Sequence, residues 1–487
     1  MSQQELELPQ GWVECKINDI ADVLGGKRLP KGHSLTKQKT SFPYIRVTNF
    51  QNNTINQENL QFIDKKTHEV IKKYTISSND LYISIAGSIG KVGVIPSNLN
   101  GANLTENSAK ICNMEIEKKF LNYQLNAPLC QQQILKLITS TNQGKLALFR
   151  IKEINILMSS INEQKRIVSK IEELFSKIDH TEQSLEHTKL QLEQYRQSLL
   201  KFAFEGKLTE EWRQKHTGKI GSIDDFINLI KKANNEKNQD FLEIPREFLD
   251  KARDLPNEWS WISLANLGDL NRGKSKHRPR NDPILFGGKY PFIQTGVVKN
   301  SKGKITSFKQ TYNEIGLAQS KLFPTNTICI TIAANIADTS VLTFPACFPD
   351  SVVGYNGFSN LIENMFMFYY IQSVKSNLEA IAPSTAQKNI NLDILQKMLV
   401  PIMSNEEQKE IIARIEQGFS LIENTTQIVE SSLQKLQTMK MSILKQAFEG
   451  KLVPQDPNDE PASVLLARIK STKESQSTKQ RGIKNVK

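Results

Sequence analysis

The chain has 487 residues, and its 63 lysines and arginines outnumber its 51 aspartates and glutamates, giving a formal net charge of +12. The positive charge favours an acidic partner, either nucleic acid or an anionic membrane surface. No segment approaches the roughly 18 apolar residues that a membrane span requires, and the start of the chain predicts no secretory leader. We therefore expect a cytoplasmic protein with room for two domains and additional helices.

Cysteine and histidine spacing predicts no metal site. The six histidines are scattered, and the cysteines, which lack Cys-x-x-Cys spacing, stand at Cys15, Cys112, Cys130, Cys329 and Cys347. Dispersed cysteines of this kind are typical of reduced, buried thiols in a cytosolic protein.

The first domain is predicted over residues 1–158. Short runs rich in β-branched and aromatic residues, at 44–47, 81–85 and 92–95, alternate with Gly, Asn and Ser turns. A helical segment follows at 118–138, where Pro128 breaks or kinks the helix. The pattern predicts a mixed α+β domain.

Residues 159–208 predict one long helix. Its apolar or small positions alternate strictly in spacing between four and three residues, which is the heptad stripe of a coiled coil. Gly206 suits the position just past the helix end, because glycine tolerates the left-handed conformation there. The stripe consists of Ile167, Ile171, Leu174, Ile178, Thr181, Leu185, Thr188, Leu192, Tyr195, Leu199 and Phe202.

The remaining chain predicts four further segments. A charged linker with short helices covers 209–253, and a second mixed domain covers 254–402. A second long helix covers 403–452 and ends at Gly450. The last segment, 453–487, is a polar, basic tail in which 462–469 can add one or two helical turns and 471–487 is expected to be disordered.

The second half of the chain repeats the first. Residues 164–208 align without a gap with residues 408–452, at a constant offset of 244. Both stretches open with Gln-Lys and close with Ala-Phe-Glu-Gly-Lys-Leu, and Leu-Pro-Gln-Gly-Trp at 8–12 returns as Leu-Pro-Asn-Glu-Trp at 255–259. The period far exceeds the roughly 20–50 residues of solenoid repeats. The chain is therefore a duplicated module of domain plus helix, with the heptad phase kept at Ile411, Ile415, Gly418, Ile422, Thr425, Val429, Ser432, Leu436, Met439, Ile443 and Gln446.

One catalytic motif matches by letters alone. Residues 268–275 fit the phosphate-loop pattern GxxxxGK[ST], which binds phosphate only where a strand enters the loop and a helix leaves it. The residues after Ser275 do not favour a helix, and the repeat copy at 21–28 lacks the first glycine and the serine. We interpret the match as chance. Methyltransferase and nuclease signatures are not convincing either, so the sequence predicts no enzyme.

The repeated motifs resemble one family over nearly the whole chain. The segments at 8–12 and 255–259, the Ile83–Ile95 stretch, Ser384–Ile390, the helix starts and the AFEGKL helix ends are similar to specificity subunits of type I restriction–modification systems. The resemblance implies an α+β fold in which two mixed target recognition domains are separated by two long antiparallel coiled-coil helices with pseudo-twofold symmetry. It also implies double-stranded DNA, two modification (methyltransferase) subunits and ATP-dependent restriction subunits as partners, with S-adenosylmethionine, ATP and Mg held by those partners and no cofactor here.

The helix length agrees with such an arrangement. The stripe from Ile167 to Phe202 spans 35 residues, or about 53 Å at 1.5 Å per residue. This is about one and a half turns of duplex DNA. Two domains held apart by such helices would read a bipartite target, and their different polar residues predict unlike half-sites. A free-standing DNA-binding regulator with the same two domains is the alternative.

Candidate DNA-binding residues are basic or amide side chains in the predicted loops. Arg272–Arg280 carries five lysines and arginines at alternate positions, so an extended strand would present all of them to phosphates. Base reading needs arginine, lysine, asparagine or glutamine in the major groove. The candidates are Lys27, Arg28, Lys31, Arg46, Asn49, Ser88, Lys91, Gln143, Arg272, Lys274, Lys276, Arg278, Arg280, Gln294, Asn335, Gln387 and Lys388.

The repeated helix ends are candidates for binding modification subunits, since twin surfaces suit two identical partners. For the two phenylalanines, packing in a core is the favoured interpretation and docking is the alternative. The candidate residues are Phe204, Glu205, Lys207, Phe448, Glu449 and Lys451.

Overall fold

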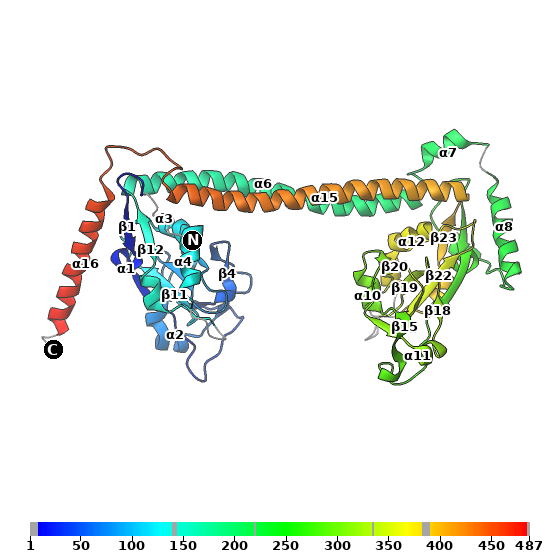
Figure 1. Ribbon diagram of the computed structural model, residues 1–487, viewed down its shortest axis with the longest axis horizontal. Helices are drawn as coiled ribbons and strands as arrows, with labels where there is room; N and C mark the ends of the chain where they lie inside the picture. The colour runs from blue at the N-terminus through cyan, green and yellow to red at the C-terminus, as the bar shows by residue number, and fades with distance from the viewer. Residues whose placement is uncertain (1–7, 139–143, 219–220, 334–335, 382–389, 485–487) are drawn as a thin grey trace. The chain divides into compact units, whose positions relative to one another are not determined.

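The computed structural model describes residues 8–138, 144–218, 221–333, 336–381 and 390–484. The chain divides into two compact units, one made of Met1–Glu186 with Glu430–Lys487 and the other of His187–Val429. Two long helices, α6 (Ile161–Phe204) and α15 (Asn405–Phe448), each contribute one half to each unit (Figure 1). Each unit therefore holds one mixed domain together with a pair of helix halves.

The domain of the first unit is built on two four-stranded sheets. One sheet is antiparallel and has the order β2 (Asp22–Gly25), β11 (Ser108–Cys112), β8 (Leu81–Ser84) and β9 (Val92–Val94). The other has the order β6 (Gln61–Phe62), β3 (Pro43–Ile45), β10 (Ala102–Leu104) and β7 (Thr75–Ile76), with β3 and β10 parallel. Two smaller pairs are β1 (Val13–Lys16) with β12 (Asn155–Met158), and β4 (Phe50–Gln51) with β5 (Thr54–Ile55).

Short helices pack on these sheets. They are α1 (Ile17–Ile20), α2 (Lys65–Ile71), α3 (Lys118–Asn126), α4 (Pro128–Lys136) and α5 (Leu148–Lys152). The predicted break at Pro128 is confirmed, because Ala127 is extended and Pro128 starts a new helix. The main core joins Leu81, Ile83 and Ile111 of the sheet to Phe120 and to Ile167 of α6. The domain and its long helix thus share one hydrophobic core.

The second unit repeats this architecture. Its larger sheet has the order β14 (Gly268–Arg272), β22 (Val352–Gly357), β19 (Ile328–Thr331), β20 (Thr339–Leu342) and β16 (Lys304–Ile305). The other has the order β17 (Gln310–Tyr312), β15 (Phe286–Phe292), β21 (Ala346–Cys347) and β18 (Leu322–Phe323). The pair β13 (Ser260–Ser263) with β23 (Leu399–Ile402) matches β1 with β12. The helices here are α10 (Thr295–Asn300), α11 (Glu314–Ala318), α12 (Asn364–Ser373), α13 (Lys375–Ile381) and α14 (Leu392–Gln396).

The long helices run antiparallel within each unit. In the first unit Lys440 Nζ lies 2.7 Å from Asp179 and 2.8 Å from Glu182, and Gln437 Nε2 donates to Glu182 at 2.6 Å. In the second unit Arg196 lies 3.8 Å from the centroid of the Phe419 ring. Earlier residues of one helix thus meet later residues of the other, as predicted.

The buried stripe keeps only some of the predicted heptad positions toward the end of each helix, where Leu199 and Ile443 remain buried. Tyr195 and Met439 are both 51% exposed, whereas Leu200 and Leu444 are buried. A straight α-helix drifts by about 20° per heptad relative to a 3.5-residue repeat. Over the 35 predicted residues this rotates the original stripe by about 100°. The helix ends therefore bury residues that face the cores of their own units, such as Ala203 and Ala447.

The segment after each long helix adds a helix to its own unit. The linker forms α7 (Glu210–His216), α8 (Ile223–Glu236) and α9 (Arg246–Leu249), and Lys237, just after α8, pairs with Asp269. The end of the chain forms α16 (Ala462–Lys484), whose Lys473 pairs with Asp22 at 3.6 Å. The expectation of disorder over 471–487 was wrong for the described part of that segment. Leu465 and Ile469 anchor the start of α16 in the core of the first unit, and Lys473 Nζ donates to the carbonyl oxygens of Asn18 and Ala21.

Candidate nucleic-acid interface

The start of each long helix is tied to its domain by a buried tryptophan–glutamate hydrogen bond. Trp12 Nε1 donates to Glu163 Oε2 at 3.1 Å, and Trp259 Nε1 donates to Glu407 Oε2 at 3.0 Å. Both glutamates lie in the first turn of a helix, where the macrodipole favours a negative charge. The repeated tryptophans therefore position helices, which explains why the motif recurs.

A buried glutamine follows each of these glutamates. Gln164 and Gln408 are fully buried. Their side-chain oxygens accept hydrogen bonds from Glu117 N at 2.9 Å and Glu363 N at 3.0 Å, the residues at the start of α3 and α12. Each repeated glutamine thus joins a long helix to a helix of its own domain.

The end of each long helix is held by a glycine–proline contact. Gly206 and Gly450 adopt φ of +77° and +69°. A Cβ atom at either glycine would lie 2.5 Å from Cγ of Pro256 or Pro9, respectively. Both the left-handed conformation and the close approach require glycine, so the AFEGKL and Leu-Pro motifs form one joint in each unit.

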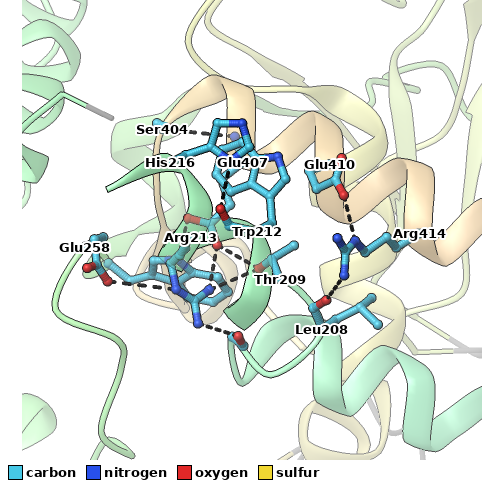
Figure 2. Close-up of polar contacts among 12 residues, drawn as sticks. Leu208, Thr209, Trp212, Arg213, His216, Glu258, Ser404, Glu407, Glu410 and Arg414 are labelled. Carbon is cyan, nitrogen blue, oxygen red and sulfur yellow. Dashed lines mark hydrogen bonds and ion pairs between the residues drawn. The ribbon is translucent and has the colours of Figure 1, made fainter. Parts of the chain in front are cut away.

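The two glutamates differ in their second oxygen. Glu407 Oε1 accepts from Arg213 at 2.6 Å and from Thr209 at 2.7 Å (Figure 2). Glu163 Oε1 is buried and has no hydrogen-bond partner among the residues that the structure describes. Arg213 comes from α7 of the linker, a segment that does not align with anything in the first half. No repeat or residue spacing in the sequence indicates the Arg213–Glu407 ion pair, so it was not predicted.

This difference predicts a pH effect at Glu163. Burial raises the pKa of Glu163 above its ordinary value of 4.5, against the lowering effects of Trp12 and Arg166. A raised folded-state pKa favours folding when the carboxyl is protonated, and this stabilisation is lost as pH rises through the folded-state pKa. Glu163→Gln should therefore become more stable relative to the native protein as pH rises from about 4.5 to 7.

Thermal unfolding of both proteins across this pH range measures the difference. Asp459, whose pKa is lowered mainly by its hydrogen bond to Arg166, contributes the opposite slope. That contribution is present in both proteins and cancels in the comparison. A difference that stays constant with pH would contradict the prediction.

The phosphate-loop match is not a phosphate loop in the fold. Gly268–Arg272 is strand β14, paired with β22, and no helix follows Ser275. A Cβ at Gly273 would collide with the carbonyl oxygens of Phe348 and Pro349, and one at Gly26 with those of Leu104 and Thr105. Close backbone packing, and not a ligand, accounts for the repeated glycine. The interpretation as chance is confirmed.

The basic segment 272–280 is not the extended strand that we expected. Arg272 Nε donates to the Asp350 carbonyl oxygen, and Arg280 pairs with the Asp350 carboxylate at 2.7 Å. Arg278 donates to the carbonyl oxygens of Ser275 at 2.6 Å and His277 at 2.8 Å. The segment folds back on the domain, so three of its five cations contact the protein itself. The side chains of all five, Lys274 and Lys276 included, are exposed.

In the first domain, Lys27, Arg28 and Lys31 are exposed on the loop after β2. Arg28 Nε donates to Glu106 at 2.7 Å. Asn49 is 2% exposed, and its side chain bonds to Arg46 N at 3.0 Å and to the Asn56 carbonyl oxygen at 3.3 Å. Asn49 is therefore a turn residue, and we leave it out of the interface.

The remaining candidates lie in loops at strand ends. Ser88 and Lys91 are exposed, and Lys91 Nζ donates to the Phe50 carbonyl oxygen at 3.1 Å. Arg46 is half-buried, while Gln294 is exposed and donates to Gln310 at 3.0 Å. Four candidates lie outside the described residues: Gln143, Asn335, Gln387 and Lys388.

The phenylalanines at the helix ends are core residues, which confirms the favoured interpretation, so naming them as partner-binding candidates was wrong. Phe204 is 1% exposed and its ring lies 5.3 Å from that of Phe366, and Phe448 lies 5.3 Å from Phe120. The charged residues beside them remain at the surface. Glu205 pairs with Lys207, and Glu449 with Lys451, at 2.8 Å in both copies.

In the described parts of the chain, no three His, Cys, Asp or Glu side chains are grouped so as to hold a metal ion. Of the helices described, none is long and apolar enough to cross a membrane.

Comparisons with known proteins agree on one family. The model of the type I restriction modification DNA specificity domain matches residues 9–189 and 256–433. A putative type I restriction enzyme specificity subunit (MjaX) of Methanocaldococcus jannaschii is 22% identical, with 92% of this chain and 95% of the relative covered. The EcoKI specificity subunit of Escherichia coli K12 is 23% identical, with 96% of each covered.

Solved structures support the same fold. A chain from a study of complex assembly and conformational transition in the type I R-M system has a TM-score of 0.64 at 16% identity, covering 91% of this chain and 99% of its own. The HsdS subunit from Thermoanaerobacter tengcongensis has a TM-score of 0.54 at 16% identity, covering 93% and 100%. The family model spans both repeats, including the tryptophan motifs and most of both long helices. The chain therefore belongs to the family of type I restriction–modification specificity subunits, which recognise DNA and are not themselves catalytic.

Proposed function

We propose that this chain reads a bipartite, asymmetric DNA sequence, with one half-site for each domain. It acts with two modification subunits and with restriction subunits, and these partners hold the S-adenosylmethionine, ATP and Mg that the reactions need. Phosphate contacts place each domain on the duplex, and polar side chains at strand ends read base edges.

The observation that carries the proposal is that two unlike domains are joined to antiparallel helices by the same contacts. The tryptophan–glutamate, glutamine–backbone and glycine–proline joints recur in both units. The surfaces of the two domains differ, since Lys27-Arg28-Leu29 corresponds to Lys274-Ser275-Lys276. The same helix–domain contacts therefore hold two domains with different surfaces, and this arrangement suits a target with two different halves.

Methylation mapping tests this proposal. The chain is expressed with the subunits encoded beside it, and methylated adenines are mapped genome-wide with and without this chain. We expect a motif of two different short blocks separated by unspecified bases. A continuous or palindromic motif would contradict the proposal. Full-affinity binding by this chain alone would instead favour the free-standing regulator.

We propose that modification subunits dock on the long helices. Large apolar side chains stand exposed there, including Leu190, Tyr195, Phe202, Leu421 and Ile428 in the second unit and Met439 and Met441 in the first. Exposed apolar residues beside charged pairs such as Glu205–Lys207 fit a protein interface with a polar rim.

A change in helix length should change the separation of the half-sites. Duplicating the heptad Leu185–Gln191 in α6 and the equivalent Val429–Lys435 in α15 keeps the repeat symmetric. Seven residues add about 10.5 Å, or about three base pairs of duplex. Methylation mapping of this variant should show the same two blocks with a spacer about three base pairs longer. An unchanged spacer would show that the helices do not set the distance.

A further inference from the structure

Helix α2 and the turn η2 (Lys72–Tyr74) form an exposed basic surface that was not predicted from the sequence. Lys65, Lys66, Lys72 and Lys73 are all exposed. Only Lys72 has a carboxylate partner within 4.0 Å in the described structure, Glu69 at 2.9 Å. The other acidic residue here is already used as the helix cap, since the Asp64 side chain accepts from Thr67 N at 2.6 Å. Three lysines are therefore left without a carboxylate.

These lysines lie on α2 and on the turn that follows it. Lys65 and Glu69, four residues apart, line one side of α2, Lys66 lies beside Lys65, and Lys72 and Lys73 belong to η2. The opposite side is fixed to the domain by Ile71, which is 1% exposed. The ammonium groups consequently point to solvent from a rigid support. Figure 1 shows α2 at the end of its domain remote from α6.

The basic face continues into the loop that follows β2. His33 Nδ1 lies 2.6 Å from Thr67 Oγ1, and Lys27 Nζ lies 5.5 Å from the centroid of the Tyr74 ring. Tyr44 donates its hydroxyl proton to the Lys27 carbonyl oxygen at 2.7 Å. Lys27, Arg28 and Lys31 on this loop therefore adjoin the lysines of α2 and η2. We call the combined set the α2 surface: Lys27, Arg28, Lys31, Lys65, Lys66, Lys72 and Lys73.

In the second domain the equivalent helix carries no lysine, although Lys321 follows it and Lys274 and Lys276 are exposed on the loop after β14. There the helix between the corresponding strands β17 and β18 is α11, and its exposed charge is Glu314, which pairs with Lys289 at 3.3 Å. Strand order in the two sheets matches, so α2 and α11 occupy the same position in the repeat. The two domains share the same strand order, but α2 and α11 differ in exposed charge. We therefore expect these two helices to contact different groups.

We propose that the α2 surface of the first domain grips the phosphate backbone of its half-site through Lys65, Lys66 and Lys73. The inference rests on the proposed function and adds to it an asymmetry, because helix α11 of the second domain carries no lysine. Lysine ammonium groups bind phosphates as point charges and fix position without reading bases. Binding through them releases counterions and so depends steeply on salt.

The test uses the full chain in complex with its co-expressed subunits. The triple variant Lys65→Ala, Lys66→Ala, Lys73→Ala is compared with a control triple, Lys215→Ala, Lys232→Ala, Lys251→Ala, whose lysines are exposed in the linker. Both lose the same net charge. Binding constants are measured against salt concentration on a duplex carrying the mapped target and on a scrambled duplex.

We expect the α2 triple to lower the slope of log K against log salt by about 2.7. This corresponds to binding about tenfold to hundredfold weaker near 0.15 M salt, on both duplexes. The control triple keeps the native slope. Phosphate ethylation should cease to interfere at one half-site only, the half-site of the first domain.

The outcomes separate the two proposals. If the α2 triple variant keeps the native slope of log K against log salt, then Lys65, Lys66 and Lys73 do not bind phosphates, whatever sequence is recognised. A reduced slope with equal loss of interference at both half-sites overturns the assignment of this grip to the half-site of the first domain. If the native complex prefers no bipartite target but the α2 triple still lowers the slope, the proposed function fails and the DNA-binding surface stands.

Discussion

Replacing Arg213 with methionine is expected to destabilise the second unit by about 3–5 kcal/mol, because it leaves a buried carboxylate without its cation. Glu407 is fully buried and Arg213 is 8% exposed, with 2.6 Å between their charged atoms. Thr209 and Trp259 still donate to Glu407 in the variant, but neither carries a charge. Hydrogen exchange of the first turns of α15 in the full chain measures the effect, since it reports on one unit at a time.

Two companion variants separate charge from packing. Arg414→Met removes another arginine of the same joint, which donates to the Leu208 carbonyl oxygen at 2.7 Å and is 33% exposed in its side chain (Figure 2). Arg414 also forms a partly exposed ion pair with Glu410. Such a pair contributes about 1 kcal/mol or less to stability, so the loss on replacing Arg414 should be small. Adding Glu407→Gln to Arg213→Met should recover much of the lost protection. Equal effects of Arg213→Met and Arg414→Met would contradict the prediction.

Removing the ring of Phe204 should have the second large effect. Phe204 lies within 5.3 Å of Phe366 and 5.1 Å of Tyr370, ring to ring, and is 1% exposed. Phenylalanine to alanine changes in such cores cost about 3–5 kcal/mol. Phe202, two residues earlier, is 46% exposed. Phe202→Ala should therefore leave stability nearly unchanged.

The same pair of variants locates the partner surface. Phe204→Ala should lower protection from hydrogen exchange throughout the second unit, whereas Phe202→Ala should weaken capture of a modification subunit in a pull-down with a folded protein. Loss of capture by Phe204→Ala at native stability would restore Phe204 to the partner surface. Full capture by Phe202→Ala would place the docking site elsewhere.

The sequence predicted elements well where a strong period or a repeat supported them. The long helices, the break at Pro128 and the two mixed domains followed from heptad spacing, proline chemistry and β-branched runs. The predicted stripe is exposed at Thr181, Tyr195 and Phe202, although Leu199 is buried. A strict heptad ignores the 3.6-residue turn of a straight helix. The tail was wrong because a polar segment forms a helix when a domain offers it a face to pack against.

The candidate site was less predictable, because charge in a sequence does not say what the charge contacts. The arginines of 272–280 were predicted to contact DNA, but they bond to Asp350 and to backbone carbonyl oxygens. Lys65, Lys66 and Lys73 were not among the predicted residues, and in the described structure no carboxylate pairs with them. Phe204 and Phe448 shared a motif with surface residues and are buried.

By itself, the sequence determined that this protein is a duplicated domain-plus-helix module, because duplication and heptad spacing are written in the order of residues. Only the tertiary structure decided which repeated residues are joints and which are free. Trp12, Gln164 and Gly206 recur because each makes a buried contact that tolerates no other side chain. Whether a lysine remains open to a phosphate depends on carboxylates and carbonyl oxygens brought near it from distant parts of the chain, and that proximity exists only once the chain has folded.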